Sequence, residues 1–150
     1  MDIKLGKGLG DIKFGFLKEK VKTILGEPNE TETYSFSEED EVLTESWHYD
    51  ELELSLSFNE EDDWRLSTIA VSSDEFLLEG KKIIGLKKDD LIKTLKSLDL
   101  KDYEENKVSD NEEMISSDIG EVNFWLEDNE VTEIQWGPFF IDEDTINWPK

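Results

Sequence analysis

The apolar residues of this chain change their spacing from a helical period to a strand period, and they do so twice. In the first half, apolar residues fall on one helical face between Leu17 and Leu25, and Gly26 followed by Pro28 ends that helix. Across residues 52–58, apolar and polar residues then alternate, as in a strand with one buried face. This half is therefore predicted to form a helix followed by antiparallel strands.

The same order recurs in the second half of the chain. An apolar stripe between Leu91 and Leu98 predicts a helix, whose first turn holds Asp89 and Asp90 near the positive end of the helix dipole. An alternating pattern follows this helix as well. We predict two hairpins, one pairing residues 52–58 with 66–71 and the other pairing residues 121–126 with 131–136.

The distribution of charge follows the same division. Residues 1–26 and 81–101 are rich in Lys, whereas residues 27–80 and 102–150 are rich in Asp and Glu. A basic segment followed by an acidic segment thus occurs twice, together with the recurring apolar pattern. This self-similarity indicates two copies of one structural unit.

We therefore predict an α+β fold of two tandem repeats, each a helix packed on antiparallel strands, forming one sheet-and-helix layer structure. Repeat 1 is expected to span residues 12–79 and repeat 2 residues 80–150, within a single compact domain. Residues 1–11 are expected to be a flexible leader, because their glycine-rich run lacks the spacing of a phosphate-binding loop. Two polar stretches, 35–44 and 104–117, are predicted to be loops.

The composition narrows the range of partners. With 39 Asp and Glu against 16 Lys and Arg, the net charge is −23, which disfavours nucleic acids and anionic membrane surfaces as partners. The chain contains no Cys, which excludes disulfides and thiolate metal sites and fits a reducing compartment. No signal peptide is found, and no apolar run approaches the roughly 18 residues of a membrane span. A cytoplasmic location is therefore expected.

Short motifs in the first half carry a family resemblance. They are Gly-Phe-Leu-Lys-Glu-Lys-Val at residues 15–21, Leu-Gly-Glu-Pro at residues 25–28, and Trp-His-Tyr at residues 47–49 before an alternating strand. This pattern resembles the signature of the β-lactamase-inhibitor-protein-like and small outer-membrane-assembly lipoprotein superfamily, in its tandem-repeat form. The resemblance implies a helix or helical pair against a small antiparallel sheet, duplicated in the inhibitor-protein branch. No functional residue is carried over from that family.

Residues that could perform chemistry are few. His48 is the only histidine, and a general base needs an oriented neighbour and a cleft, which this sequence pattern does not reveal. The sequence has no Gly-x-Ser-x-Gly elbow, and its acidic runs lack the alternating ligands and central Gly of a calcium loop. We expect no enzymatic activity, no cofactor and no metal site. An enzyme built around His48 is the least favoured hypothesis.

The sheet face turned away from the helices is the predicted binding surface. The two-residue period turns Trp125 away from the apolar stripe of its strand, onto an acidic face. Protein interfaces use buried aromatic anchors for affinity and charged rims for steering. Two points stay open: the register of the Trp47 strand, and whether residues 139–148 cover Trp125. The candidate protein-binding residues are Trp125, Glu53, Glu121, Glu133, Trp47 and Tyr49.

The function predicted from these features is that of a non-enzymatic, acidic protein-binding module with a basic protein as its partner. Its specific form would be an immunity or inhibitor protein that neutralises a basic toxin or nuclease, because a compact anion can occupy a cationic nucleic-acid site and associate quickly. The alternative is a structural or regulatory domain without a dedicated inhibitory partner, whose acidity serves solubility. The sequence makes no prediction of the oligomeric state.

Overall fold

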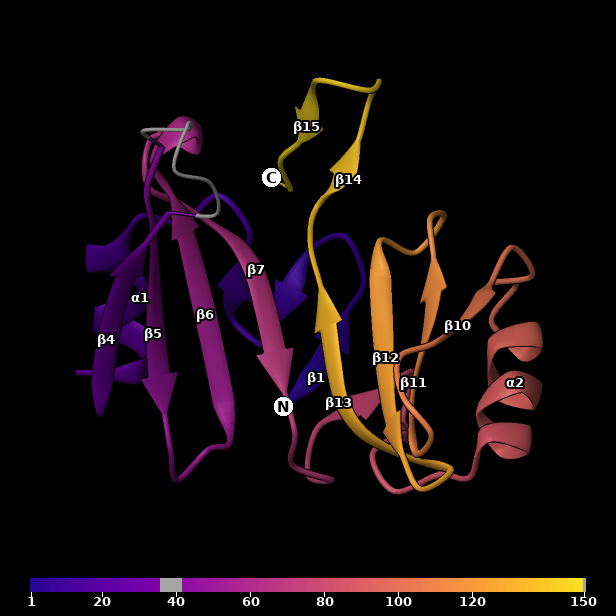
Figure 1. Ribbon diagram of the computed structural model, residues 1–150. Coiled ribbons are helices and arrows are strands. Elements are labelled where there is room, and N and C mark those ends of the chain that lie inside the picture. Colours follow the sequence, from indigo (N-terminus) through magenta and orange to yellow (C-terminus); the bar gives the residue numbers. More distant parts are fainter. Residues whose placement is uncertain (36–41, 150) are drawn as a thin grey trace.

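The computed structural model describes residues 1–35 and 42–149, whose strands form a large sheet, a small sheet and a hairpin (Figure 1). The eight-stranded sheet has the order β10 (Glu104–Lys107), β11 (Glu112–Ser117), β12 (Val122–Glu127), β13 (Glu130–Trp136), β7 (Arg65–Val71), β6 (Leu54–Asn59), β5 (Thr44–Tyr49) and β4 (Glu30–Tyr34). The five-stranded sheet has the order β3 (Ile12–Lys13), β2 (Gly8–Leu9), β1 (Asp2–Lys4), β8 (Leu77–Leu78) and β9 (Lys81–Lys82). The remaining elements are the hairpin β14 (Phe139–Phe140) and β15 (Ile146–Asn147), the helices α1 (Lys18–Leu25) and α2 (Lys88–Ser97), and the 3-10 turn η1 (Glu60–Asp62).

The eight-stranded sheet joins two antiparallel meanders edge to edge. One runs from β4 to β7 and the other from β10 to β13, and they meet where β13 pairs with β7. At this junction Ile134 lies opposite Val71, and Trp136 lies opposite Ile69. The two predicted hairpins, β6 with β7 and β12 with β13, are confirmed.

The fold is mostly β, and the predicted α+β class of two helix-on-strand tandem repeats is wrong. The helices have only 8 and 10 residues, whereas the strands build sheets of eight and five members. The pairing of β13 with β7 joins the two halves into one continuous sheet, but a second sheet of five strands also forms, which the helix-on-strand repeats did not include. The prediction relied on apolar alternation, and that signal is absent from several of the strands.

The edge strands show why this signal is missing. Both β4 and β10 are exposed along their whole length, so neither strand alternates apolar with polar residues. Their backbones are held by the ladders to β5 and β11. Consequently the predicted loop 104–117 is instead β10, a turn and β11. Of the other predicted loop, 35–44, residues 36–41 lie outside the described residues.

The N-terminal segment 1–11 is part of the fold, so its prediction as a flexible leader is wrong. It forms β1 and β2, and the side chains of Ile3 and Leu9 are buried. Gly8 has a φ of +149°, and a Cβ there would lie 2.0 Å from the carbonyl oxygen of Ile12. Glycine therefore permits the close approach of β2 and β3 in a tight turn, where flexibility was inferred.

The core lies between one face of the eight-stranded sheet and a layer made of the two helices and the N-terminal strands (Figure 1). Val21 of α1 and Leu91 of α2 are fully buried in it. Trp136 also lies in the core, and its indole N–H donates a 3.1 Å hydrogen bond to the carbonyl of Gly8. In the described part of the chain, neither helix has the length and apolar character needed to cross a membrane.

Candidate functional site

Strand register assigns the side chains of the large sheet to two faces. Trp47 lies opposite Leu56, and both belong to the buried core that the helices cover. The residues between such positions point to the other face, because side chains alternate along a strand. We call this other side the open face; its central members are Ser46, His48, Ser55, Ser57, Thr68, Ala70, Gln135, Asn123, Trp125, Ser116 and Met114.

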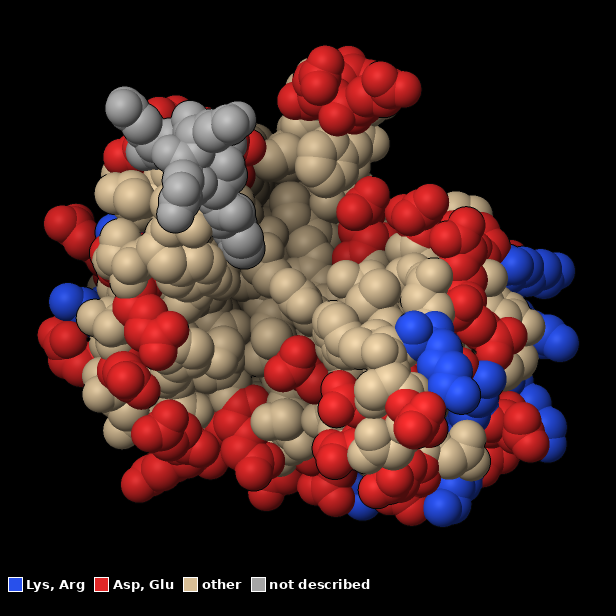
Figure 2. Space-filling view, viewed as in Figure 1, with Lys and Arg blue, Asp and Glu red and all other residues tan. Residues whose placement is uncertain are grey.

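The open face is hollowed in the middle and bordered by acids. Figure 2 shows a recessed centre coloured mostly tan, with Asp and Glu in red around its margin. Hydroxyl and amide side chains from β6, β7, β12 and β13 form the floor of this recess. Such a floor can form hydrogen bonds with a partner without burying a charged side chain of its own. The acids around it make the electrostatic potential at the recess negative.

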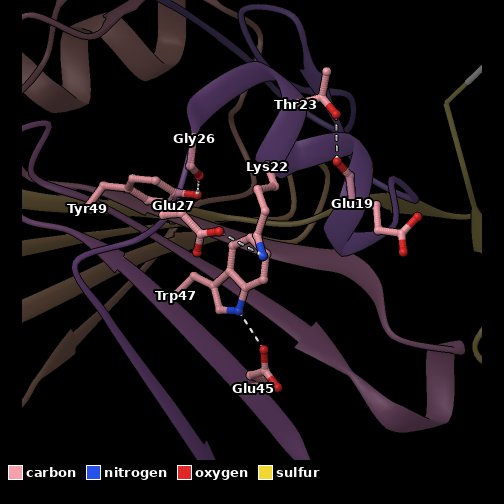
Figure 3. Close-up of polar contacts among 8 residues, drawn as sticks. All are labelled: Glu19, Lys22, Thr23, Gly26, Glu27, Glu45, Trp47 and Tyr49. Atoms are coloured by element: carbon pink, nitrogen blue, oxygen red, sulfur yellow. Dashed lines mark hydrogen bonds and ion pairs between the residues drawn. The ribbon is translucent and has the colours of Figure 1, made fainter.

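Trp47 and Tyr49 are not on the open face, and their prediction as protein-binding residues is wrong. They are 4% and 5% exposed and face α1 (Figure 3). The Tyr49 hydroxyl donates a 2.9 Å hydrogen bond to the carbonyl of Gly26 at the end of α1. The Trp47 ring lies under the ammonium group of Lys22, and its indole N–H donates to the carboxylate of Glu45. These two aromatic residues therefore anchor the helix.

Trp125 occupies the open face as the two-residue period predicts. It is half-buried on β12, opposite Met114 on one side and Glu133 on the other. The indole N–H of Trp125 is buried and has no hydrogen-bond partner among the described residues. A buried donor without an acceptor costs about 1–3 kcal/mol. The Trp125 indole therefore lowers the free energy of unfolding at this position. Residues 139–148 do not bury it completely.

Glu133 adjoins this tryptophan and shares its environment. Its side chain is half-buried, and burial raises the pKa of its carboxyl group above the usual value. The carboxyl group therefore carries a desolvation cost when ionised. Glu133 also lines a hollow together with Glu53, so these two predicted site residues border the same recess.

Glu53 and Glu121 lie in turns, at the margins of the open face. Each directly precedes a strand and has a positive φ, 53° for Glu53 and 49° for Glu121. The prediction placed both within strands, which is wrong because β6 begins at Leu54 and β12 at Val122. Burial, and to a smaller extent the nearby Asp118, raises the pKa of Glu121.

An acidic recess lies between the sheet and the C-terminal hairpin. This first hollow has a volume of about 470 Å³, and Thr68, Asn123 and Gln135 contribute to its floor. No Lys or Arg is found among the described residues that line it. Its carboxylates come from η1, the turn before β12 and the hairpin loop: Glu61, Asp62, Asp118, Glu121, Glu143 and Asp144.

The hairpin that forms one wall of this hollow was missed by sequence reasoning. Asp142 closes its turn by accepting hydrogen bonds from the backbone N–H groups of Asp144 and Thr145, and these bonds lower the pKa of Asp142. Phe140 and Ile146 line the hollow, and Phe140 is 45% exposed. The sequence signal for this hairpin is a pair of aromatic residues followed by an Asp-rich turn. Its strands have only two residues each, which is too short to show a periodic pattern.

A second hollow of about 360 Å³ contains the only histidine. The Nδ1 atom of His48 lies 2.9 Å from the Ser55 hydroxyl, and its Nε2 atom lies 3.9 Å from a carboxylate oxygen of Glu32. These residues come from the adjacent strands β6, β5 and β4. An acyl-transfer site also needs donors aimed at a developing oxyanion, whereas Ser55 lies inside a strand whose backbone pairs on both sides. The backbone of Ser55 is therefore engaged in the sheet ladders.

Comparisons with protein-family models, with curated proteins and with solved structures find no match for this chain.

Proposed function

We propose that this chain is a non-enzymatic, cytoplasmic protein-binding module whose open face binds a basic protein. The observation that supports this most is the charge pattern of the face, where two recesses with polar floors are bordered by carboxylates. In both, no Lys or Arg occurs among the described lining residues. A cationic loop entering the first hollow would meet acids on several sides. The absence of Cys is consistent with a reducing compartment.

Two aromatic residues are suited to anchor such a partner. Trp125 is half-buried on the sheet, and Phe140 projects from the hairpin wall of the first hollow. Interfaces concentrate their affinity in a few aromatic residues surrounded by polar groups. The acids would therefore speed association, whereas Trp125 and Phe140 would slow dissociation.

The specific role that we propose is neutralisation of a basic toxin or nuclease. Enzymes that act on nucleic acids have cationic sites, and an acidic recess can occupy such a site. The resemblance to the inhibitor-protein branch of the superfamily is compatible with this role and stays a prediction. The alternative is a structural or regulatory domain, for which open-face acids would matter only for solubility.

Affinity capture with matched charge variants tests the proposal. The first variant combines Glu121→Gln, Glu143→Gln and Asp144→Asn at the first hollow. The control variant combines Glu19→Gln, Asp89→Asn and Asp90→Asn, exposed positions on the helices that change the net charge equally. We expect a basic protein to be captured by the wild type and the control but not by the first variant.

Kinetics with the captured partner then separate the roles of charge and ring. The first variant should slow association, whereas Trp125→Ala should speed dissociation at a cost of roughly 2 kcal/mol or more. If the partner is a toxin, its activity should fall in proportion to complex formed. Equal capture by both charge variants, or an unchanged dissociation rate for Trp125→Ala, would exclude the open face as the binding surface.

A further inference from the structure

A third hollow, on the N-terminal strands, has the opposite character from the open face. It has a volume of about 640 Å³ and lies between the β1–β3 strands and the C-terminal hairpin. Aromatic and apolar walls come from Phe139, Trp148 and Pro149, and three lysines lie at its rim: Lys4, Lys7 and Lys13. We call it the cationic hollow.

The charge of this hollow contrasts with that of the open face. The chain has 39 Asp and Glu, yet none of them is among the described residues that line the cationic hollow. Carboxylates do line both hollows of the open face. Lysine is therefore the only charged residue type among the described lining residues of this hollow, and the open face has the opposite composition.

The aromatic walls are held in place by glycines. A Cβ on Gly6 would lie 2.3 Å from the Phe139 ring, so this ring packs directly on the backbone of Gly6. A Cβ on Gly15 would lie 3.1 Å from the Trp148 ring, and the guanidinium of Arg65 lies 5.6 Å from the centre of the same ring. The walls are thus packed before any ligand arrives, which lowers the entropy cost of binding.

We propose that the cationic hollow binds a small aromatic anion, a planar ring bearing a carboxylate, sulfonate or phosphate group. Its volume lies within the range of ligand pockets, about 300–1,000 Å³, and such pockets combine apolar walls with a few placed polar groups. The ring would contact Phe139 and Trp148, and the anionic group would face the lysines at the rim.

The net negative charge of the chain favours a small anion over an extended polyanion as the ligand. An extended polyanion would have to lie along a surface of net charge −23, whereas a small anion experiences mainly the charges within a Debye length, about 8 Å at physiological salt. The proposal is independent of the binding function of the open face, because Phe139 lines this hollow while its neighbour Phe140 lines the first hollow.

Titration followed by NMR tests the proposal with two probes of similar shape. Naphthalene-2-sulfonate carries the anionic group, and naphthalene-2-methanol lacks it. The signals to follow are the indole N–H of Trp148, assigned with Trp148→Phe, and the backbone amides of Gly6 and Lys7. We expect the sulfonate to shift these signals and to bind about tenfold more tightly than the alcohol, a difference of about 1.4 kcal/mol.

Matched charge reversals locate the interaction. Lys4→Glu with Lys7→Glu should weaken sulfonate binding by about tenfold or more, whereas Lys93→Glu with Lys96→Glu, exposed on α2 and equal in charge change, should alter it less than about twofold. Lys4→Gln with Lys7→Gln should give an intermediate loss, and this neutral pair keeps the test valid if the reversal unfolds the chain. Equal weakening by both reversals, equal affinity for both probes, or shifts confined to other tryptophans would overturn the proposal.

Discussion

The indole N–H of Trp125 offers a test of whether the open face is maintained at a cost to folding. This donor is buried without a hydrogen-bond partner among the described residues, which should destabilise the fold by about 1–3 kcal/mol. Trp125→Phe removes the donor and keeps an aromatic ring. The smaller ring loses apolar contact, and a loss of about 30 Å² would cost about 0.8 kcal/mol at about 25 cal/mol per Å². We therefore expect Trp125→Phe to stabilise the protein by about 1 kcal/mol.

The matched control is the same substitution at Trp136. That indole N–H donates a hydrogen bond to the Gly8 carbonyl, and the side chain is 1% exposed. Trp136→Phe removes the hydrogen bond to the Gly8 carbonyl and opens a cavity between the sheet and β2, so we expect a loss of about 3 kcal/mol. One chemical change should therefore have opposite effects on the two faces of the sheet.

Urea denaturation measures both variants against the wild type. The slope of the unfolding free energy against urea should stay constant, because the surface exposed on unfolding barely changes. For a chain of this size, 1 kcal/mol corresponds to about 2–4 °C in Tm, so thermal scans provide an independent reading. If Trp125→Phe destabilises the protein by about 1 kcal/mol or more, the assignment of an unsatisfied donor is refuted.

Three other perturbations concern charge. Lys88→Met should lower the free energy of unfolding by about 1 kcal/mol near neutral pH. Glu105 and Glu113 raise the pKa of Lys88 from 10.5 to about 12, but solvent screening reduces the energy of ion pairs this close to the surface. This contribution is fully present below pH 10.5 and is lost as pH rises through about 12, which urea titrations at rising pH would detect. Glu133→Gln should stabilise the fold at neutral pH, because burial raises the pKa of Glu133 and penalises its ionised form. This gain in stability should vanish as pH falls through the raised pKa. A variant less stable than the wild type at neutral pH would contradict the prediction. Raising salt from about 0.01 to 0.1 M should raise Tm, since the Debye length falls from about 30 to 10 Å and screens the net charge of −23; a constant Tm in calorimetry would argue against self-repulsion.

Local patterns in the sequence determined the elements whose signals are contained in a short window. The end of α1 at Leu25 was predicted because an apolar stripe is followed by Gly26 and Pro28, and Gly26 has a φ of +83° in the structure. Both central hairpins were predicted because their apolar residues alternate, and the same parity turned Trp125 outward. Each of these outcomes depends on residues within about twenty positions of one another, so no distant partner was needed to infer them.

The tertiary structure decided which surfaces are covered. Alternation places Trp47 and Tyr49 on one side of a strand, but only α1 packing on that side made them core residues. The fully exposed β4 and β10 are strands because their neighbours satisfy their backbone groups. The N-terminal segment is ordered because β1 pairs with β8, more than seventy residues away. Backbone pairing between distant segments depends on chain geometry, so the periodicity of side chains does not predict which distant strands pair.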